Sequence, residues 1–114
     1  MDFHTARQFV LAQTVHLTPG QTPFITQLRQ GQPPIPGQVT SLLLALKVLG
    51  DALRQEPTLD RSLAYAFFVL SYESRQCYAQ GQARGVDWPP LLDEDLTRIA
   101  AAIATILADT PASN

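Results

Sequence analysis

The sequence predicts an all-α protein, an up-and-down bundle of four main helices plus one short helix, in a single domain over residues 1–114. Apolar residues recur at intervals of three and four along most of the chain, which is the spacing of one helical face. No segment alternates apolar and polar residues as a half-buried strand would. Proline and glycine lie mainly between the periodic segments, where they end one helix before the next begins.

The first predicted helix covers residues 3–17, and a short second helix covers residues 23–30. The apolar stripe of the first consists of Phe3, Ala6, Val10 and Leu17. The run Thr18-Pro19-Gly20 is expected to end it, and Pro23 suits the first position of the next helix because it needs no amide partner there. The residues expected to point inward from the short helix are Phe24, Ile25 and Leu28.

Residues 31–37, with the sequence GQPPIPG, separate the short helix from the next long one. Three prolines in seven residues exclude a helix and favour an extended polyproline conformation. The segment is interpreted as a stiff spacer that sets the angle between two helices. The alternative is a docking motif for a partner with an aromatic groove.

The third and last predicted helices cover residues 38–55 and 91–108. The apolar face of the third is wide, and Leu44 and Val48 extend it to the opposite side. Its short link to the following helix favours an antiparallel hairpin. The stripe of the last helix consists of Leu92, Leu96, Ile99, Ile103 and Ile106.

The long helix predicted over residues 60–80, with Asp60 as its N-cap, is apolar on two faces. Its core stripe comprises Leu63, Ala66, Phe67, Leu70, Ser74, Cys77 and Tyr78. A second face of aromatic and aliphatic residues either is wrapped by the bundle or meets a partner. Trp88, beside two prolines, either packs as a lid on the bundle end or anchors a partner. The possible interface therefore comprises Tyr65, Phe68, Val69, Tyr72, Glu73, Arg75 and Trp88.

Composition narrows the possible partners. Charged residues make up 16% of the chain, below the usual ~25%, which suggests that part of the surface is covered. A net charge of −2 predicts no steering toward nucleic acid or anionic membranes. The long helix is too polar at both ends to span a bilayer. A single cysteine and an N-terminus without an apolar signal core are typical of a cytoplasmic protein.

The polar residues do not form a recognisable catalytic or metal-binding motif. The acidic residues 93–95 diverge around a helix and are interpreted as complements of its dipole. His4 and His16 are more than three helical turns apart, too far to share a metal ion. Cys77 lies on the apolar stripe, where an inert buried thiol is expected rather than a nucleophile. Phosphate-binding glycine motifs are absent from the sequence, so no cofactor is expected.

Two blocks, QPPIPGQVTSLLLALKVL (32–49) and WPPLLDEDLTRIA (88–100), carry a resemblance together with YESRQ (72–76) between them. Over about residues 22–108 the chain resembles short, largely uncharacterised helical proteins of cyanobacteria, some of which are labelled dethiobiotin synthetase. That label does not fit, because dethiobiotin synthetases resemble P-loop enzymes with an α/β fold, and this sequence shows neither the loop nor strands. The resemblance implies a cyanobacterial cytosol and no mechanism.

The sequence therefore favours a non-enzymatic interaction, scaffold or assembly protein that acts through an apolar helix face, most simply as a homodimer. The alternative is a bundle that binds a small apolar ligand between its helices. The pocket would then be lined by Phe67, Phe68, Tyr72 and Trp88. A small enzyme is the least favoured function, and the polar group available for it consists of Tyr72, Glu73 and Arg75.

Overall fold

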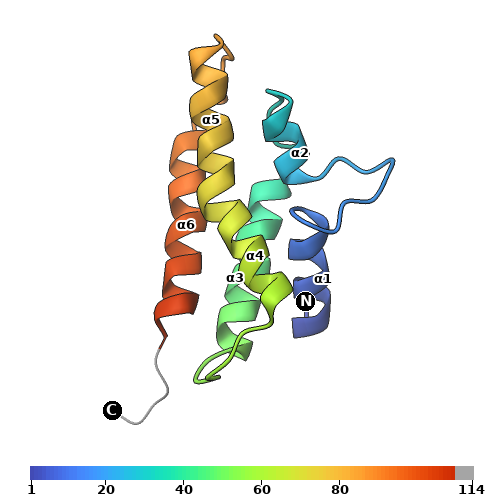
Figure 1. Ribbon diagram of the computed structural model, residues 1–114, viewed down its shortest axis with the longest axis vertical. Helices are drawn as coiled ribbons and strands as arrows, with labels where there is room; N and C mark the ends of the chain where they lie inside the picture. The colour runs from blue at the N-terminus through green and yellow to red at the C-terminus, as the bar shows by residue number, and fades with distance from the viewer. Residues whose placement is uncertain (110–114) are drawn as a thin grey trace.

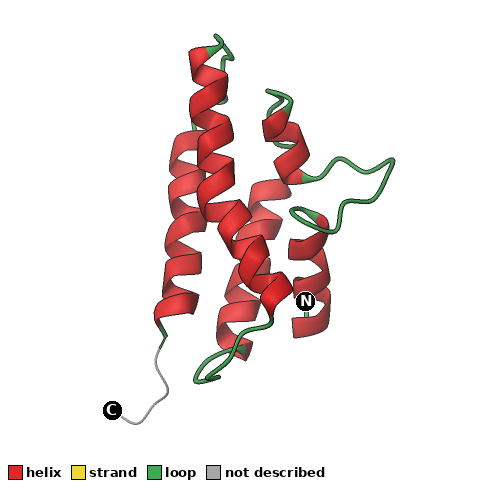
Figure 2. Ribbon diagram, in the orientation of Figure 1, coloured by secondary structure: helices red, strands yellow, loops and turns green. Residues whose placement is uncertain are grey.

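A computed structural model describes residues 1–109 of the chain, and this part is all-helical, as predicted (Figures 1 and 2). The elements are α1 (Phe3–Ala12), α2 (Phe24–Arg29), α3 (Gln38–Ala52), α4 (Arg61–Phe68), the π-helical turn η1 (Val69–Glu73), α5 (Ser74–Ala83) and α6 (Leu92–Ala108). Because α4, η1 and α5 follow without interruption, they form one long helix from residue 61 to residue 83. None of the described helices combines the length and the hydropathy needed to cross a bilayer.

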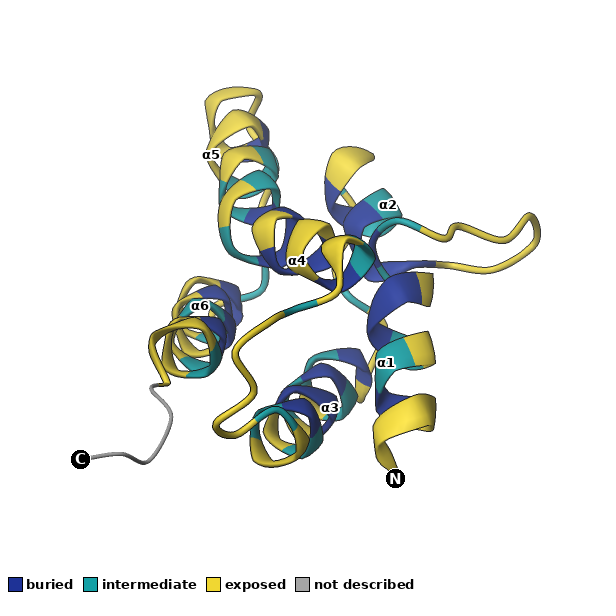
Figure 3. Ribbon diagram, turned by 60° about the horizontal axis from the view of Figure 1, so that its bottom comes forward, coloured by how far each residue is buried: buried dark blue, intermediate teal, exposed yellow. Residues whose placement is uncertain are grey.

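The buried faces of α1, α3, α4 and α6 turn toward one another around a common centre (Figure 3). Helix α3 packs against α1 on one side and α6 on the other, while the long helix contacts α1, α2 and α6 along its length. The expected hairpin of the third helix with the long helix is therefore not the main contact. Helix α3 ends at Ala52, earlier than predicted, and the longer link up to Asp60 allows α4 to cross α3 instead of running alongside it.

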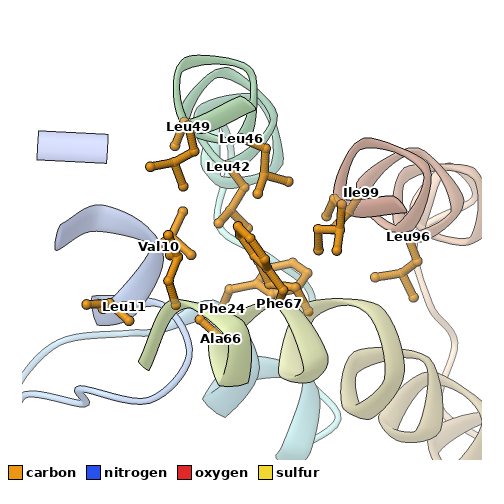
Figure 4. Packing of buried hydrophobic residues seen from close by; sticks show 14 of the residues in the cluster. Val10, Leu11, Phe24, Leu42, Leu46, Leu49, Ala66, Phe67, Leu96 and Ile99 are labelled. Atoms are coloured by element: carbon orange, nitrogen blue, oxygen red, sulfur yellow. The ribbon is translucent and has the colours of Figure 1, made fainter. Parts of the chain in front are cut away.

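One apolar cluster forms the core and takes side chains from α1, α2, α3, α4, η1 and α6. Phe67 reaches from the long helix toward Leu42 and Leu46 of α3 (Figure 4). The predicted inward residues of the short helix are all fully buried, and they are Phe24, Ile25 and Leu28. Burial of such side chains contributes roughly 25 cal/mol per Å² of apolar surface and is the main stabilising term of the fold.

The first helix is shorter than the predicted 3–17, because it ends at Ala12. The amides of Val15 and His16 both donate to the carbonyl of Leu11, and the buried hydroxyl of Thr14 donates to the carbonyl of Val10. The Val15 bond keeps the α-helical spacing, but the His16 bond spans five residues, and the chain leaves the helix at this point. Leu17 consequently lies exposed instead of on the core stripe, and Phe3, at the start of the helix, is also exposed. The other predicted boundaries agree with the structure to within one helical turn.

Asp60 begins the long helix as predicted. Its Oδ1 accepts from the amide of Leu63 at 3.0 Å, and its Oδ2 accepts from Arg7 Nε at 2.7 Å. The Arg7 hydrogen bond, followed by the Leu63 amide, lowers the pKa of the Asp60 carboxyl below its ordinary value. One side chain thus caps α4 and joins it to α1.

The π-helical turn interrupts the long helix at its centre. Ser71 Oγ donates to the carbonyl of Phe67 at 2.7 Å, and Ser74 Oγ donates to the carbonyl of Leu70. Carbonyls four residues earlier are the normal acceptors of α-helical amides, so these hydroxyls compete with the regular ladder. The competition favours a locally wider turn, of the kind that is often found at functional sites.

Candidate functional site

Three aromatic side chains form a continuous exposed row along the long helix, called here the aromatic ladder (Tyr65, Phe68 and Tyr72). Their exposed fractions are 52%, 47% and 52%. The ring centroids of Tyr65 and Phe68 are 6.2 Å apart and those of Phe68 and Tyr72 are 5.2 Å apart, and both pairs are stacked. The Gln76 side-chain amide donates to the Tyr72 hydroxyl at 2.7 Å. The ladder is therefore an ordered apolar surface with a polar end.

The position of the ladder follows from its spacing. Residues three and four apart lie on one side of a helix, so Tyr65, Phe68 and Tyr72 point in a common direction. Phe67, the neighbour of Phe68, lies about 100° away around the helix axis and is buried in the core. Contiguous exposed apolar surface on a small protein commonly marks an interaction site.

Glu73 and Arg75, predicted at the edge of the interface, are both paired within the chain. Glu73 Oε2 lies 2.9 Å from Arg29 Nη2 of α2. Arg75 Nη1 lies 2.5 Å from Asp93 Oδ1 of α6, and its Nη2 donates to Thr97 Oγ1 at 3.0 Å. Exposed pairs of this kind contribute at most about 1 kcal/mol each. They tie the long helix to α2 and α6 and leave the ladder between them without a free charge from either side chain.

Two predicted interface residues, Val69 and Trp88, lie in the interior. Val69 is 1% exposed because α2 and α6 both pack against the π-helical turn that carries it. Trp88 is 8% exposed, donates from Nε1 to the carbonyl of Tyr78 at 3.0 Å and stacks on the Tyr78 ring. Of the two alternatives for Trp88, packing within the fold is the one observed. The exposed surface is therefore smaller than the predicted face.

The predicted ligand pocket does not assemble. Phe67 lies in the core, whereas Phe68 and Tyr72 lie on the outer surface of the same helix. Trp88 belongs to the buried core and packs against Tyr78 of α5. These four side chains do not face a common cavity, so a ligand held between them receives no support from the structure.

Sequence reasoning did not single out Gln13 and Gln38, which the structure brings together at a pocket between α1 and α3. Gln38 is buried, and its Nε2 donates to Gln13 Oε1 at 2.9 Å. Glutamine carries no charge and sets no periodicity, so no pattern in the sequence indicated that these side chains meet.

Among residues 1–109 no group of three or more His, Cys, Asp or Glu side chains is placed to hold a metal ion. Asp93 pairs with Arg75, and Asp95 lies 3.5 Å from Arg98 within its own helix. Cys77 is half-buried, and burial raises the pKa of its thiol, an effect that nearby Arg29 only partly opposes. A raised pKa leaves less of the reactive thiolate at neutral pH.

At pH 8, iodoacetamide should alkylate Cys77 in the folded protein at least about threefold more slowly than it alkylates the same cysteine in the chain unfolded in 6 M urea. The rate should rise with an inflection above the ordinary thiol pKa of about 8.5. Because the folded chain holds this proton more tightly than the unfolded chain, the stabilisation is present below the unfolded pKa and is lost as pH rises through the folded pKa. Rapid alkylation with an inflection below pH 8 would show an activated cysteine instead.

Comparison of the chain with protein-family models, with curated proteins and with solved structures finds no match in any of the three. The resemblance to cyanobacterial helical proteins therefore stays a prediction.

Proposed function

We propose that the chain is a non-enzymatic assembly protein that associates with a second copy of itself through the aromatic ladder. The observation that carries this proposal is the exposure of three stacked aromatic rings on one helix. Tyrosine and other aromatic side chains lose little conformational entropy on contact and are enriched at protein interfaces. As part of the same proposal, the helices form an up-and-down bundle and the protein acts in the cytoplasm, where a lone cysteine stays reduced.

The ladder is suited to pairing with itself. Phe68 lies three residues after Tyr65 and four before Tyr72, so the row is nearly symmetric about its middle ring. A two-fold axis near Phe68, with the two long helices antiparallel, places Tyr65 opposite Tyr72 of the second copy. Such an interface uses the same patch on both copies, as closed dimers require. Aromatic pairs of this type contribute about 0.5–1.5 kcal/mol each beyond the area they bury.

The overall charge permits the association. The net charge of −2 produces little repulsion between two copies, and Glu73 and Arg75 beside the ladder are already neutralised by partners in the same chain. The second copy therefore meets an apolar row with internally paired charges at the Tyr72 end and with exposed Arg61 one helical turn before Tyr65 at the other end.

The surface area that the aromatic ladder can bury indicates a weak dimer. Rings that bury about 150–250 Å² each when covered, and that are half exposed, offer roughly 300 Å² per copy. A standard stable interface buries about 800 Å² per partner. The dimer is therefore expected at high micromolar concentration and should dissociate on dilution.

Phe68→Glu should weaken dimerisation at least about tenfold, because it places a charge at the centre of the apolar contact. Sedimentation equilibrium between about 10 and 500 μM measures the effect. Leu44→Ser is the matched control, since Leu44 is a half-exposed apolar residue of α3, which does not carry the ladder. Circular dichroism establishes that both variants keep the helical fold.

Two results would count against the proposal. The first is a wild-type protein that stays monomeric across this range. The second is an equal loss of dimer in Phe68→Glu and Leu44→Ser, which would indicate non-specific apolar association.

A further inference from the structure

A pocket of about 310 Å³ lies where the end of α1, the loop before α2, the proline-rich segment and the start of α3 meet. Its apolar wall includes Phe9, Pro23 and Ile35, and its polar wall includes Gln13, Thr22 and Gln38. All the described side chains that line it are uncharged. The volume is at the lower end of the range of small-molecule sites.

The side-chain amide of Gln38 has a fixed orientation. Its Oε1 accepts from the backbone amide of Ile35 at 3.0 Å, and its Nε2 donates to the backbone carbonyl of Thr22 at 3.0 Å. A backbone amide only donates and a carbonyl only accepts, so the oxygen and nitrogen of Gln38 cannot exchange places. The second hydrogen of Nε2 goes to Gln13 Oε1.

Gln13 is fixed in turn by the same logic. Its Oε1 accepts from both Gln38 Nε2 and the backbone amide of Phe24, the latter at 2.7 Å. Its Nε2 has no hydrogen-bond partner among residues 1–109, and no buried side-chain nitrogen or oxygen in that range is left unpaired, so this nitrogen is open to solvent. Gln13 lines the pocket, and its side-chain nitrogen has no hydrogen-bond partner among the described residues, so its N–H groups are available to a ligand there.

We propose that this pocket binds a small neutral molecule with an apolar body and a carbonyl or similar hydrogen-bond acceptor. The apolar body lies against Phe9 and Ile35, and the acceptor receives the free N–H groups of Gln13. A charged ligand is disfavoured, because the lining supplies no opposite charge for a group that loses water on binding. The site is separate from the aromatic ladder and does not depend on the proposed dimer.

The ordered side-chain amide of Gln13 is the basis for selecting ligands that have a hydrogen-bond acceptor. A hydrogen bond to a side chain that is already ordered costs little conformational entropy on binding. A site built around such a donor rejects molecules that lack an acceptor, because its amide then loses water without compensation. The whole Gln38 amide and the Gln13 oxygen thus serve the fold, and the Gln13 nitrogen is left for the pocket.

The probe for the test is N,N-dimethyl-2-phenylacetamide, which has one ring, one neutral carbonyl acceptor and no N–H donor that could bond to the carboxylate of the variant described below. Titration of ¹⁵N-labelled protein up to about 20 mM should give a dissociation constant in the millimolar range, as expected for a ligand of this size. The chemical-shift changes should be largest for the Gln13 side-chain amide and for the backbone around residues 35–38. No change at these positions, or changes confined to the ladder residues, would overturn the proposal.

Gln13→Glu is the decisive variant. The carboxylate keeps oxygen acceptors for the Phe24 amide and for Gln38, but it has none of the N–H donors that the proposed ligand would need. The shift changes at residues 35–38 should fall at least about threefold at fixed probe concentration. Ala12→Phe, at an exposed position on the pocket rim, provides a second variant that obstructs the pocket without altering the glutamine pair. Binding that survives in both folded variants would refute the site.

Discussion

Phe67→Ala should lower the free energy of unfolding by about 3–5 kcal/mol, whereas Phe68→Ala should change it by no more than about 0.5 kcal/mol. The two residues are adjacent and chemically identical, but Phe67 is 1% exposed and Phe68 is 47% exposed. Removing Phe67 leaves a cavity between the long helix and α3, where Leu42 and Leu46 lose their contacts (Figure 4). Urea unfolding followed by circular dichroism, with a common m-value, gives both changes.

The pair also separates the fold from the proposed association. At about 2 μM the protein is expected to be monomeric, so Phe67→Ala should show its full loss in the free energy of unfolding and Phe68→Ala should show almost none. At several hundred micromolar, Phe68→Ala should become more destabilising because dimerisation stabilises the folded state. Equal losses for both variants at low concentration would mean that the long helix is rotated relative to this structure.

Gly81→Ala should destabilise the protein by about 2 kcal/mol, although alanine is the better helix former by about 1 kcal/mol. A Cβ added at Gly81 would lie 2.4 Å from Cζ2 and 2.8 Å from Cε2 of Trp88. The indole cannot retreat freely, because its Nε1 donates to the Tyr78 carbonyl and its ring stacks on Tyr78. Thermal unfolding measures the loss, and tryptophan fluorescence reports the displacement of the ring.

Trp88→Phe provides the test of that mechanism. A phenyl ring lacks the outer atoms that meet the new Cβ, so Gly81→Ala should cost markedly less in the Trp88→Phe background than alone. Gly50→Ala is the control in α3, where the added Cβ meets Ile106 Cγ1 at 3.2 Å and a flexible aliphatic chain can adjust. If Gly81→Ala raises the unfolding temperature, the close packing of Trp88 on α5 is wrong.

The sequence was sufficient for those features that depend on local pattern. Periodicity located the helices, Asp60 was identified as a cap, and the spacing of Tyr65, Phe68 and Tyr72 placed them on one exposed face. The assignment of Val69 to that face was wrong because α2 and α6 pack against the turn that carries this residue. Neither this packing nor the bonds of the Ser71 and Ser74 hydroxyls to helix carbonyls, which favour the wide turn, is visible in apolar spacing.

Structural features formed by residues that are far apart in the chain could not be predicted from the sequence pattern. The early end of α1 accompanies a tie between Gln13 and the amide of Phe24, eleven residues later. The burial of Trp88 requires the absence of a side chain at Gly81. The pocket requires Gln38 to reach Thr22 and Gln13 across a loop. In each case one uncharged residue acts through a partner that nothing in the local sequence specifies.

The π-helical turn has a consequence for the length of the chain. One π-helical turn contains about one residue more than one α-helical turn. A regular helix would therefore join α4 to α5 with about one residue fewer than the chain contains. The surplus residue shifts the register of α5 relative to α4, so an apolar stripe that is counted in steps of three and four from Leu63 does not continue unchanged beyond Glu73.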